Sequence, residues 1–118
     1  MKINILDCTL RDGGYYNNWN FSKSLIDKYI KSMIASNIDY VELGFRMIVQ
    51  DNSKGYTAFT TDNFLESINN INKLKIGVMV NAADLIQHNK GIINALKNLF
   101  PKTNKSKIKL VRIACHFN

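Results

Sequence analysis

The sequence predicts an α/β fold built on a parallel sheet. Four apolar, β-rich runs, at residues 3–10, 39–45, 75–80 and 108–115, alternate with three segments whose apolar residues recur at helical spacing. Such alternation is typical of parallel strands joined by helical crossovers. The strands are nearly continuously apolar, as is expected when both faces of a sheet are covered. We therefore predict four parallel strands in the order 1-2-3-4 with three crossover helices.

The connecting segments carry helix start and stop signals. Ser22 can cap a first helix that ends near Asn37, and Thr61 can cap a second. A third helical segment, residues 83–100, ends at Pro101 and is expected to be interrupted near Gly91. The inner face predicted for this segment has six apolar residues: Leu85, Ile86, Ile92, Ile93, Leu96 and Leu99.

The length of the chain separates two architectures that share this element order, an open doubly wound sheet and part of a closed (β/α)8 barrel. A complete barrel needs about 250 residues, whereas this chain has 118. The pair Gly13-Gly14 after the first strand is not the G-x-G-x-x-G of dinucleotide-binding folds, and no P-loop lysine pattern occurs. We therefore predict that residues 1–118 form one domain, about half of a TIM barrel.

The composition is that of a folded protein. Hydrophobic residues make up 46% of the chain and charged residues 21%, which argues against disorder. No apolar run is long enough to span a bilayer, and the N-terminus lacks a signal-peptide cleavage pattern. A cytoplasmic location is therefore expected, with no membrane partner. Cys8 and Cys115 lie in apolar runs without metal-ligand spacing, so both are expected to be reduced, buried thiols.

The charge is unevenly distributed. All nine acidic residues lie before residue 85, whereas seven of the sixteen basic residues follow it. A basic segment can bind nucleic acid, but no aromatic residue interleaves with the lysines of residues 102–109 and no nucleic-acid motif is present. We interpret this segment as a solvated surface and expect no nucleic-acid partner.

Polar side chains follow the predicted strands. Asp12 comes after the first, Glu42 and Arg46 lie at the second, Asn81 follows the third, and His116 the fourth. Functional residues in barrels collect at the C-terminal ends of strands. We therefore expect these side chains to cluster at one end of the sheet.

Residue types within this set favour metal-assisted carbonyl chemistry. A carboxylate such as Asp12 can bind a hard divalent cation. Arg11 beside it can stabilise an enolate oxygen, because arginine keeps its charge and offers several donors. Glu42 stands between Val41 and Leu43, and an acid within an apolar run needs a partner or a metal.

Residues 6–13, Leu-Asp-Cys-Thr-Leu-Arg-Asp-Gly, resemble the D-x-T-L-R-D-G signature of the DRE-TIM metallolyases, which include enzymes like HMG-CoA lyase and 4-hydroxy-2-oxovalerate aldolase. Residues 40–45 are similar to the second strand of that superfamily, and residues 111–116 to the fourth strand of its aldolase branch. The loop R-D-G-G-Y-x-N-N-W resembles an aldolase subgroup. The likeness covers the whole chain and implies the N-terminal half of the barrel.

The resemblance implies a divalent-metal-dependent carbon–carbon lyase or aldolase that acts on a small 2-oxo acid, or a related acyl substrate, through an enolate. Asp12 would be one ligand of Mg²⁺ or Mn²⁺, Arg11 would hold the enolate, and Glu42 would line the pocket near the metal. Tyr15 stands where the aldolase branch has a catalytic histidine, so it is the candidate acid or base.

Other residues have less specific expectations. Asn81, Arg46 and His116 are expected to line the substrate pocket. Trp19 belongs either to the first active-site loop or to a packed loop anchor. The superfamily's His-x-His metal ligands of strand 7 do not occur here, so weak or absent metal binding, and no activity, is expected of this chain alone.

Two further functions stay open, a Claisen-type acyltransferase like isopropylmalate synthase and a non-catalytic half-barrel module. Half of a barrel has two strand edges that present unpaired N–H and C=O groups. We therefore expect a homodimer formed through the sheet edges or face.

Overall fold

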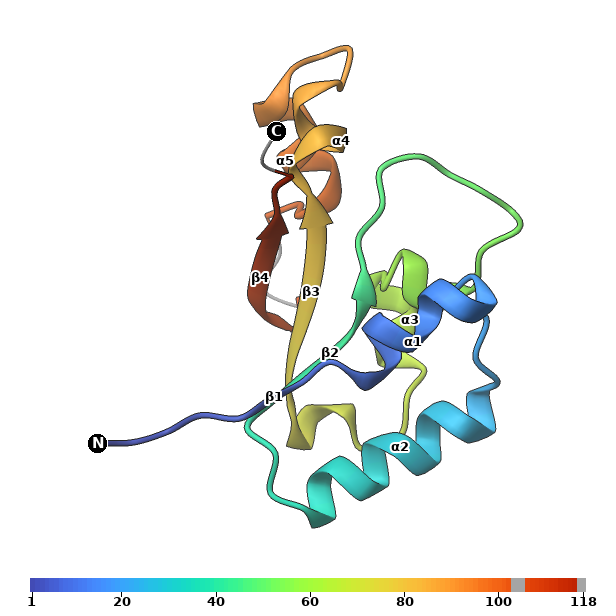
Figure 1. Ribbon diagram of the computed structural model, residues 1–118, viewed down its shortest axis with the longest axis vertical. Coiled ribbons are helices and arrows are strands. Elements are labelled where there is room, and N and C mark those ends of the chain that lie inside the picture. The colour runs from blue at the N-terminus through green and yellow to red at the C-terminus, as the bar shows by residue number, and fades with distance from the viewer. Residues whose placement is uncertain (103–105, 117–118) are drawn as a thin grey trace.

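The computed structural model describes residues 1–102 and 106–116, and its centre is a four-stranded parallel sheet. The strand order is β1-β2-β3-β4, as predicted, in an arrangement compatible with half of a (β/α)8 barrel (Figure 1). The strands are β1 (Leu6–Asp7), β2 (Tyr40–Phe45), β3 (Lys75–Asn81) and β4 (Ile108–Ala114).

Three crossovers join the strands, and each is divided into more than one helical piece, whereas the sequence predicted one helix in each of the first two and an interrupted helix in the third. The first holds α1 (Thr9–Asn17) and α2 (Lys23–Ala35); the second η1 (Tyr56–Ala58), α3 (Asp62–Glu66) and η2 (Ile71–Lys73); the third α4 (Ala82–Ile86) and α5 (Ile92–Leu99). The predicted caps are confirmed. Ser22 accepts a hydrogen bond from the Leu25 N–H, and Thr61 accepts one from the Phe64 N–H.

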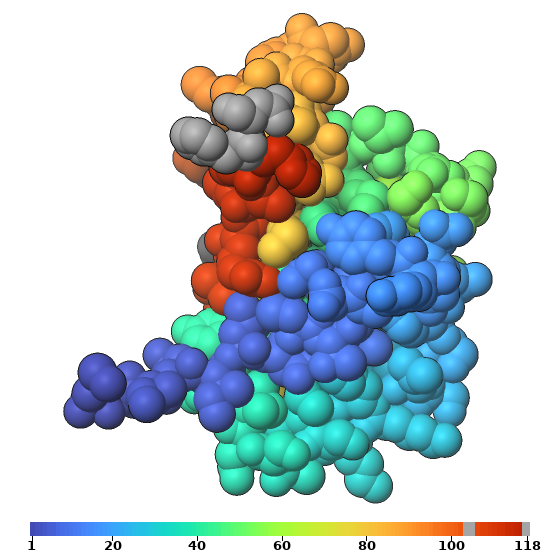
Figure 2. All heavy atoms as spheres, viewed as in Figure 1, coloured from blue at the N-terminus to red at the C-terminus, as the bar shows by residue number. Residues whose placement is uncertain are grey.

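The first strand is much shorter than predicted, because the chain turns into α1 immediately after Asp7. The Asp7 carboxylate accepts hydrogen bonds from the backbone N–H and the hydroxyl of Thr9, and this local turn competes with an extended strand. Residues 1–5 are exposed, and the N-terminal tail before Ile5 stands off from the body of the molecule (Figure 2), whereas Ile5 hydrogen bonds to Asp39 and Tyr40. The apolar run that predicted one strand therefore belongs to a tail, a short strand and the start of a helix.

Helix α1 contains two glycines, which is why the sequence favoured a loop there. Packing explains the second glycine. A Cβ on Gly14 would lie 1.9 Å from the indole of Trp19. The close packing of that ring against the helix therefore requires glycine, although glycine has a low helix propensity. Trp19 is 5% exposed, and its Nε1 donates to the carbonyl of Arg11 at 3.0 Å. The predicted anchor is thus the structural role that Trp19 fills.

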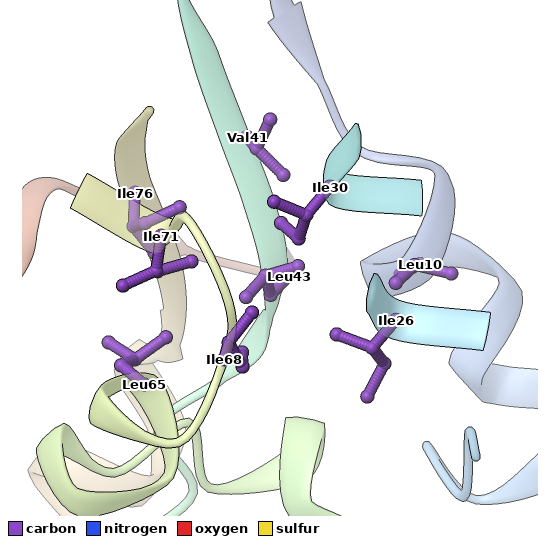
Figure 3. Close-up of a cluster of buried hydrophobic side chains, with 9 residues drawn as sticks. All are labelled: Leu10, Ile26, Ile30, Val41, Leu43, Leu65, Ile68, Ile71 and Ile76. Carbon is purple, nitrogen blue, oxygen red and sulfur yellow. The ribbon is translucent and has the colours of Figure 1, made fainter. Parts of the chain in front are cut away.

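The main core lies between the sheet and the helices of the first two crossovers. Val41 and Leu43 of β2 are fully buried, and side chains from α1, α2, the α3 region and β3 surround them (Figure 3). The cluster consists of Leu10, Ile26, Ile30, Val41, Leu43, Leu65, Ile68, Ile71 and Ile76. Its burial fixes which face of β2 is turned to the helices, and so turns Glu42 to the opposite face.

A β-bulge follows Glu42. Glu42 pairs with Gly77, whereas Gly44 pairs with the next residue of β3, Val78. The extra residue of β2 reverses the alternation of its last part. Phe45 consequently packs with Met79 and Trp19, on the face of the sheet that carries Glu42.

The third crossover agrees with the sequence in its interruption but not in its buried face. Gly91 has a φ of 81° just before α5, as a break in the helix requires. Leu85 is buried and Leu99 half-buried, but Ala95 is the buried residue of α5. Four apolar residues predicted to face inward are exposed: Ile86, Ile92, Ile93 and Leu96. Among the described residues, no further layer covers them.

Within residues 1–102 and 106–116, no helix is both long and apolar enough to cross a membrane.

Candidate functional site

The centre of the candidate site is the carboxylate of Glu42, which is 0% exposed in the middle of β2. It accepts hydrogen bonds from Arg11 Nε at 2.8 Å, and from Arg112 Nε and Nη2 at 2.7 and 2.6 Å. A buried carboxylate is tolerated only when it is paired and hydrogen-bonded. The two guanidinium groups provide this pairing, as the sequence predicted in general terms for an acid within an apolar run.

Arg11 is brought to Glu42 by α1, and its side chain is 15% exposed. Its Nη1 also donates to Asp12 Oδ1 at 3.0 Å. Burial acts to lower the pKa of Arg11, but hydrogen bonds to Glu42 and then Cys8 outweigh it and raise the pKa above its usual value. Arg11 is therefore a fixed cation at the edge of the buried carboxylate.

Arg112 reaches the same carboxylate from β4, on the far side of β3. The hydrogen bond to Glu42 raises its pKa, against burial, and its side chain is 38% exposed. The sequence predicted no role for Arg112 itself. A signal was present, because both Glu42 and Arg112 interrupt apolar strand runs, and two such charges on one sheet are candidates to pair.

Cys8 lies beside the arginines, and its Sγ is 3.2 Å from Arg112 Nη2. Burial, and then the charge of Glu42, raise the pKa of the Cys8 thiol, so the neutral thiol is favoured over the nucleophilic thiolate. Both cysteines are free, as predicted. Neither is fully buried, since Cys8 is half-buried and Cys115 is exposed where β4 has ended.

Asp12 and Tyr15 line a shallow hollow of about 560 Å³ on α1, together with Thr9, Gly13 and Tyr16. The Asp12 side chain is 74% exposed and Tyr15 is 60% exposed. The ring of Tyr15 packs edge-on against Trp19, with ring centres 4.9 Å apart. Through the contact between Asp12 and Arg11, this hollow adjoins the buried cluster.

Arg46 has a different environment from Glu42. It is 3% exposed and donates to the carbonyls of Thr60 and Leu99 and to the carboxylate of Asp62, at 3.1, 2.6 and 2.9 Å. Its guanidinium also lies 5.0 Å from the ring centre of Phe100. These contacts tie the second crossover to the third, and the pocket role predicted for Arg46 stays a prediction.

Asn81 and His116 lie at the carboxyl edge of the sheet. Asn81 ends β3, pairs in register with Ala114, and donates to Asp84 at 3.3 Å. His116 follows β4 and is exposed. Glu42 sits four residues further down, level with Gly77. The structure therefore places Asn81 and His116 at the carboxyl edge of the sheet and Glu42 deeper within the sheet. The pocket roles predicted for Asn81 and His116 stay predictions.

The described residues do not by themselves fit the divalent metal that the resemblance implies. Within residues 1–102 and 106–116, no group of three His, Cys, Asp or Glu side chains could hold an ion. Asp12 is exposed and paired with Arg11, and both oxygens of Glu42 are occupied by arginines.

Comparison with known proteins gives one relevant likeness. No family model matches the chain, and no curated protein matches it. The chain is similar to the crystal structure of the N-terminal domain of a putative aldolase from Bacteroides vulgatus, with 33% identity and a TM-score of 0.66. The match covers 96% of this chain and 36% of that one. The chain thus spans about a third of the length of the structure that it matches, and the likeness supports an aldolase-like α/β fold.

Proposed function

We propose that the protein carrying this chain is an aldolase or carbon–carbon lyase, and that Arg11 stabilises the enolate formed from a small 2-oxo acid. The observation that carries the proposal is the pairing of Arg11 with the buried Glu42. Glu42 fixes the guanidinium in place before a substrate arrives, and preorganised charge of this kind is a large contribution to catalysis. The likeness to the aldolase N-terminal domain supports the same reading.

The chemistry asked of these residues is a retro-aldol cleavage. The bond between C3 and C4 of a 4-hydroxy-2-oxo acid breaks, and its electron pair moves to the C2 carbonyl oxygen, forming an enolate. The C4 hydroxyl gives up its proton and becomes the carbonyl of the departing aldehyde or ketone, and the enolate takes up a proton at C3 to become pyruvate. Arg11 would donate an N–H group of its guanidinium to the developing enolate oxygen. Its orientation is fixed for this role, because its Nε donates to the buried Glu42 and its Nη1 donates to Asp12 at the surface.

Tyr15 is our candidate for moving the proton of the C4 hydroxyl, because it shares the hollow of Asp12 beside Arg11. Dependence on Mg²⁺ or Mn²⁺ is part of the proposal for the full protein only. Asp12 is the single metal ligand that the resemblance gives to this chain, and a site of useful affinity needs several ligands.

The test is cleavage of a series of 4-hydroxy-2-oxo acids by the full protein, with pyruvate release followed through lactate dehydrogenase. We expect release with at least one member of the series in buffer containing Mg²⁺ or Mn²⁺. The matched control is Lys109→Met, which removes an exposed charge from β4 and should leave release unchanged. Absence of release across the whole series, with either metal, would contradict the proposal.

A further inference from the structure

Glu42 and Arg112 meet across an intervening strand. Glu42 is on β2 and Arg112 on β4, and β3 lies between them. Neighbouring strands lie about 4.8 Å apart, so the two backbones are separated by about 10 Å. The β3 residue that pairs with Glu42 is Gly77, which puts no side chain between them. The long arginine side chain can therefore cross β3 and reach the buried carboxylate.

The two arginines share Glu42 unequally. Arg112 contacts both carboxylate oxygens, through Nε and Nη2 at 2.7 and 2.6 Å. Arg11 makes a single contact with Glu42, through Nε at 2.8 Å. A two-contact fork is the stronger arrangement of an arginine with a carboxylate. Arg112 and Glu42 thus form a neutral pair, and the buried cluster of these three side chains keeps one net positive charge, that of Arg11.

Other charged groups near Glu42 do not cancel that surplus. Asp12 contacts Arg11, but its carboxylate is 74% exposed and screened by water. Cys8, which precedes α1, favours its neutral thiol. From β3, Gly77 and Met79 occupy the register positions beside Glu42 and Arg112 and are not titratable.

We propose that Arg112 is a positioning residue: it neutralises Glu42, so that the positive charge of Arg11 is available to attract an anionic ligand. This inference rests on the proposed function for the identity of the ligand, the enolate or carboxylate of a 2-oxo acid. Without Arg112, Arg11 and the buried Glu42 would form a neutral pair, and no net positive charge would remain to attract an anion. Arg112 therefore acts on anion binding through Glu42, without contacting the anion.

The experiment measures oxalate binding to the full protein by isothermal titration calorimetry. Oxalate is a planar dianion of about the size of the pyruvate enolate. Arg112→Met removes the charge but keeps much of the apolar stem, and we expect it to weaken oxalate binding by at least about tenfold. Arg112→Lys keeps a charge beside Glu42 and should bind within about threefold of the original protein.

The decisive variant is Glu42→Gln combined with Arg112→Met. Its glutamine oxygen can still accept from Arg11 Nε, while the negative charge that Arg112 had neutralised is gone. We expect the double variant to recover most of the affinity that Arg112→Met loses. Recovery would not occur if Arg112 contacted the anion directly, so a double variant as weak as Arg112→Met, or weaker, overturns the inference.

Other outcomes are equally informative. Breaking a buried pair by removing one partner destabilises strongly, whereas replacing both partners is tolerated. If Arg112→Met does not fold, near-original affinity in both Arg112→Lys and the double variant supports the inference, and a double variant that binds at least about tenfold more weakly overturns it. An Arg112→Met variant with unchanged affinity, or an original protein without oxalate binding, also overturns it.

The calorimetric ranking does not depend on turnover. If the cleavage assay shows no pyruvate release while the double variant recovers oxalate affinity, the proposed function fails and the role of Arg112 stands. If release occurs but the double variant does not recover oxalate affinity, the proposed function stands and the role of Arg112 fails. Lys109→Met, on the same strand, serves as the control for a general loss of positive charge.

Discussion

Asp7 and Tyr29 form a hydrogen-bonded pair between β1 and α2, directly before Cys8. Burial acts to raise the pKa of Asp7, but hydrogen bonds from Tyr29 and Thr9 outweigh it and lower the pKa from its usual 3.8. Burial, and then the hydrogen bond to Asp7, raise the pKa of Tyr29 above 10.0. The pair is therefore most stable as a carboxylate that accepts from a neutral phenol.

This pair predicts how stability depends on pH. The contribution of Asp7 is present above pH 3.8 and is lost as the pH falls through its lower folded-state pKa. The contribution of Tyr29 is present below pH 10.0 and is lost as the pH rises toward its raised folded-state pKa. Tyr29→Phe removes the phenol and one hydrogen bond of Asp7. We expect its free energy of unfolding to vary less with pH on both sides, in urea titrations at about pH 3, 7 and 10.5. Equal pH slopes in the two proteins would show that the pair contributes nothing.

Arg46 illustrates how one residue type supports two interpretations. Its place at the end of the second predicted strand suggests a substrate-pocket residue. In the structure its donors reach backbone carbonyls of two crossovers and the carboxylate of Asp62, which is a structural role that the sequence did not predict. Those carbonyls belong to residues 14 and 53 positions away in the sequence, and no local pattern encodes that distance.

At the scale of elements, α1 offers a matched pair of substitutions. A Cβ on Gly13 would find its nearest atom, in the Phe21 ring, 3.9 Å away, whereas a Cβ on Gly14 would lie 1.9 Å from the Trp19 indole. We expect Gly13→Ala to raise the free energy of unfolding by about 0.5–1 kcal/mol, because alanine favours the helix. Gly14→Ala should lower it by about 1–3 kcal/mol, because the site is already filled.

Urea denaturation of the two variants checks the sign of each change. Both substitutions add the same methyl group one residue apart in one helix, so propensity alone predicts equal gains. A stabilising Gly14→Ala would mean that Trp19 is free to move and does not anchor α1.

Elements with strong periodic patterns were predicted well from sequence. The last three strands, their parallel order, the caps at Ser22 and Thr61, and the break near Gly91 all agree with the structure. These features depend on short-range signals, namely apolar runs and capping side chains.

The elements that were missed depend on long-range packing. The Gly13-Gly14 pair suggests a loop by propensity, yet Trp19 packing holds it in α1. The cross-sheet pairing of Arg112 with Glu42 depends on strand register, which a bulge in β2 alters. The exposed face of α5 depends on which layers are present, and no helix pattern contains that information.

At the scale of the whole molecule, β1 and β4 are the edges of the sheet in the described part of the chain. Val111 and Ile113 of β4 are 41% and 56% exposed. An open strand edge with apolar side chains can pair with a second copy. We propose that the 118-residue chain forms a two-fold dimer through β4.

Analytical ultracentrifugation at micromolar concentration measures this association. We expect a dimer for the original chain and a shift to monomer for Ile113→Lys, because a charge on an edge strand discourages pairing. The control, Ile3→Lys, adds the same charge to the exposed N-terminal tail and should leave the dimer unchanged. An original chain that sediments as a 13.5 kDa monomer would rule out the dimer.

The central claim, that Arg11 held by Glu42 stabilises an enolate, is tested most directly by deuterium exchange into the methyl group of pyruvate in D₂O, followed by proton NMR. Exchange requires the enolate but no cleavage of a carbon–carbon bond. For the full protein we predict exchange above the rate in buffer. Arg11→Lys should slow it by about 10²–10³, with pyruvate affinity little changed, because lysine keeps the charge but loses the planar fork. Exchange at the original rate in Arg11→Lys would contradict the account.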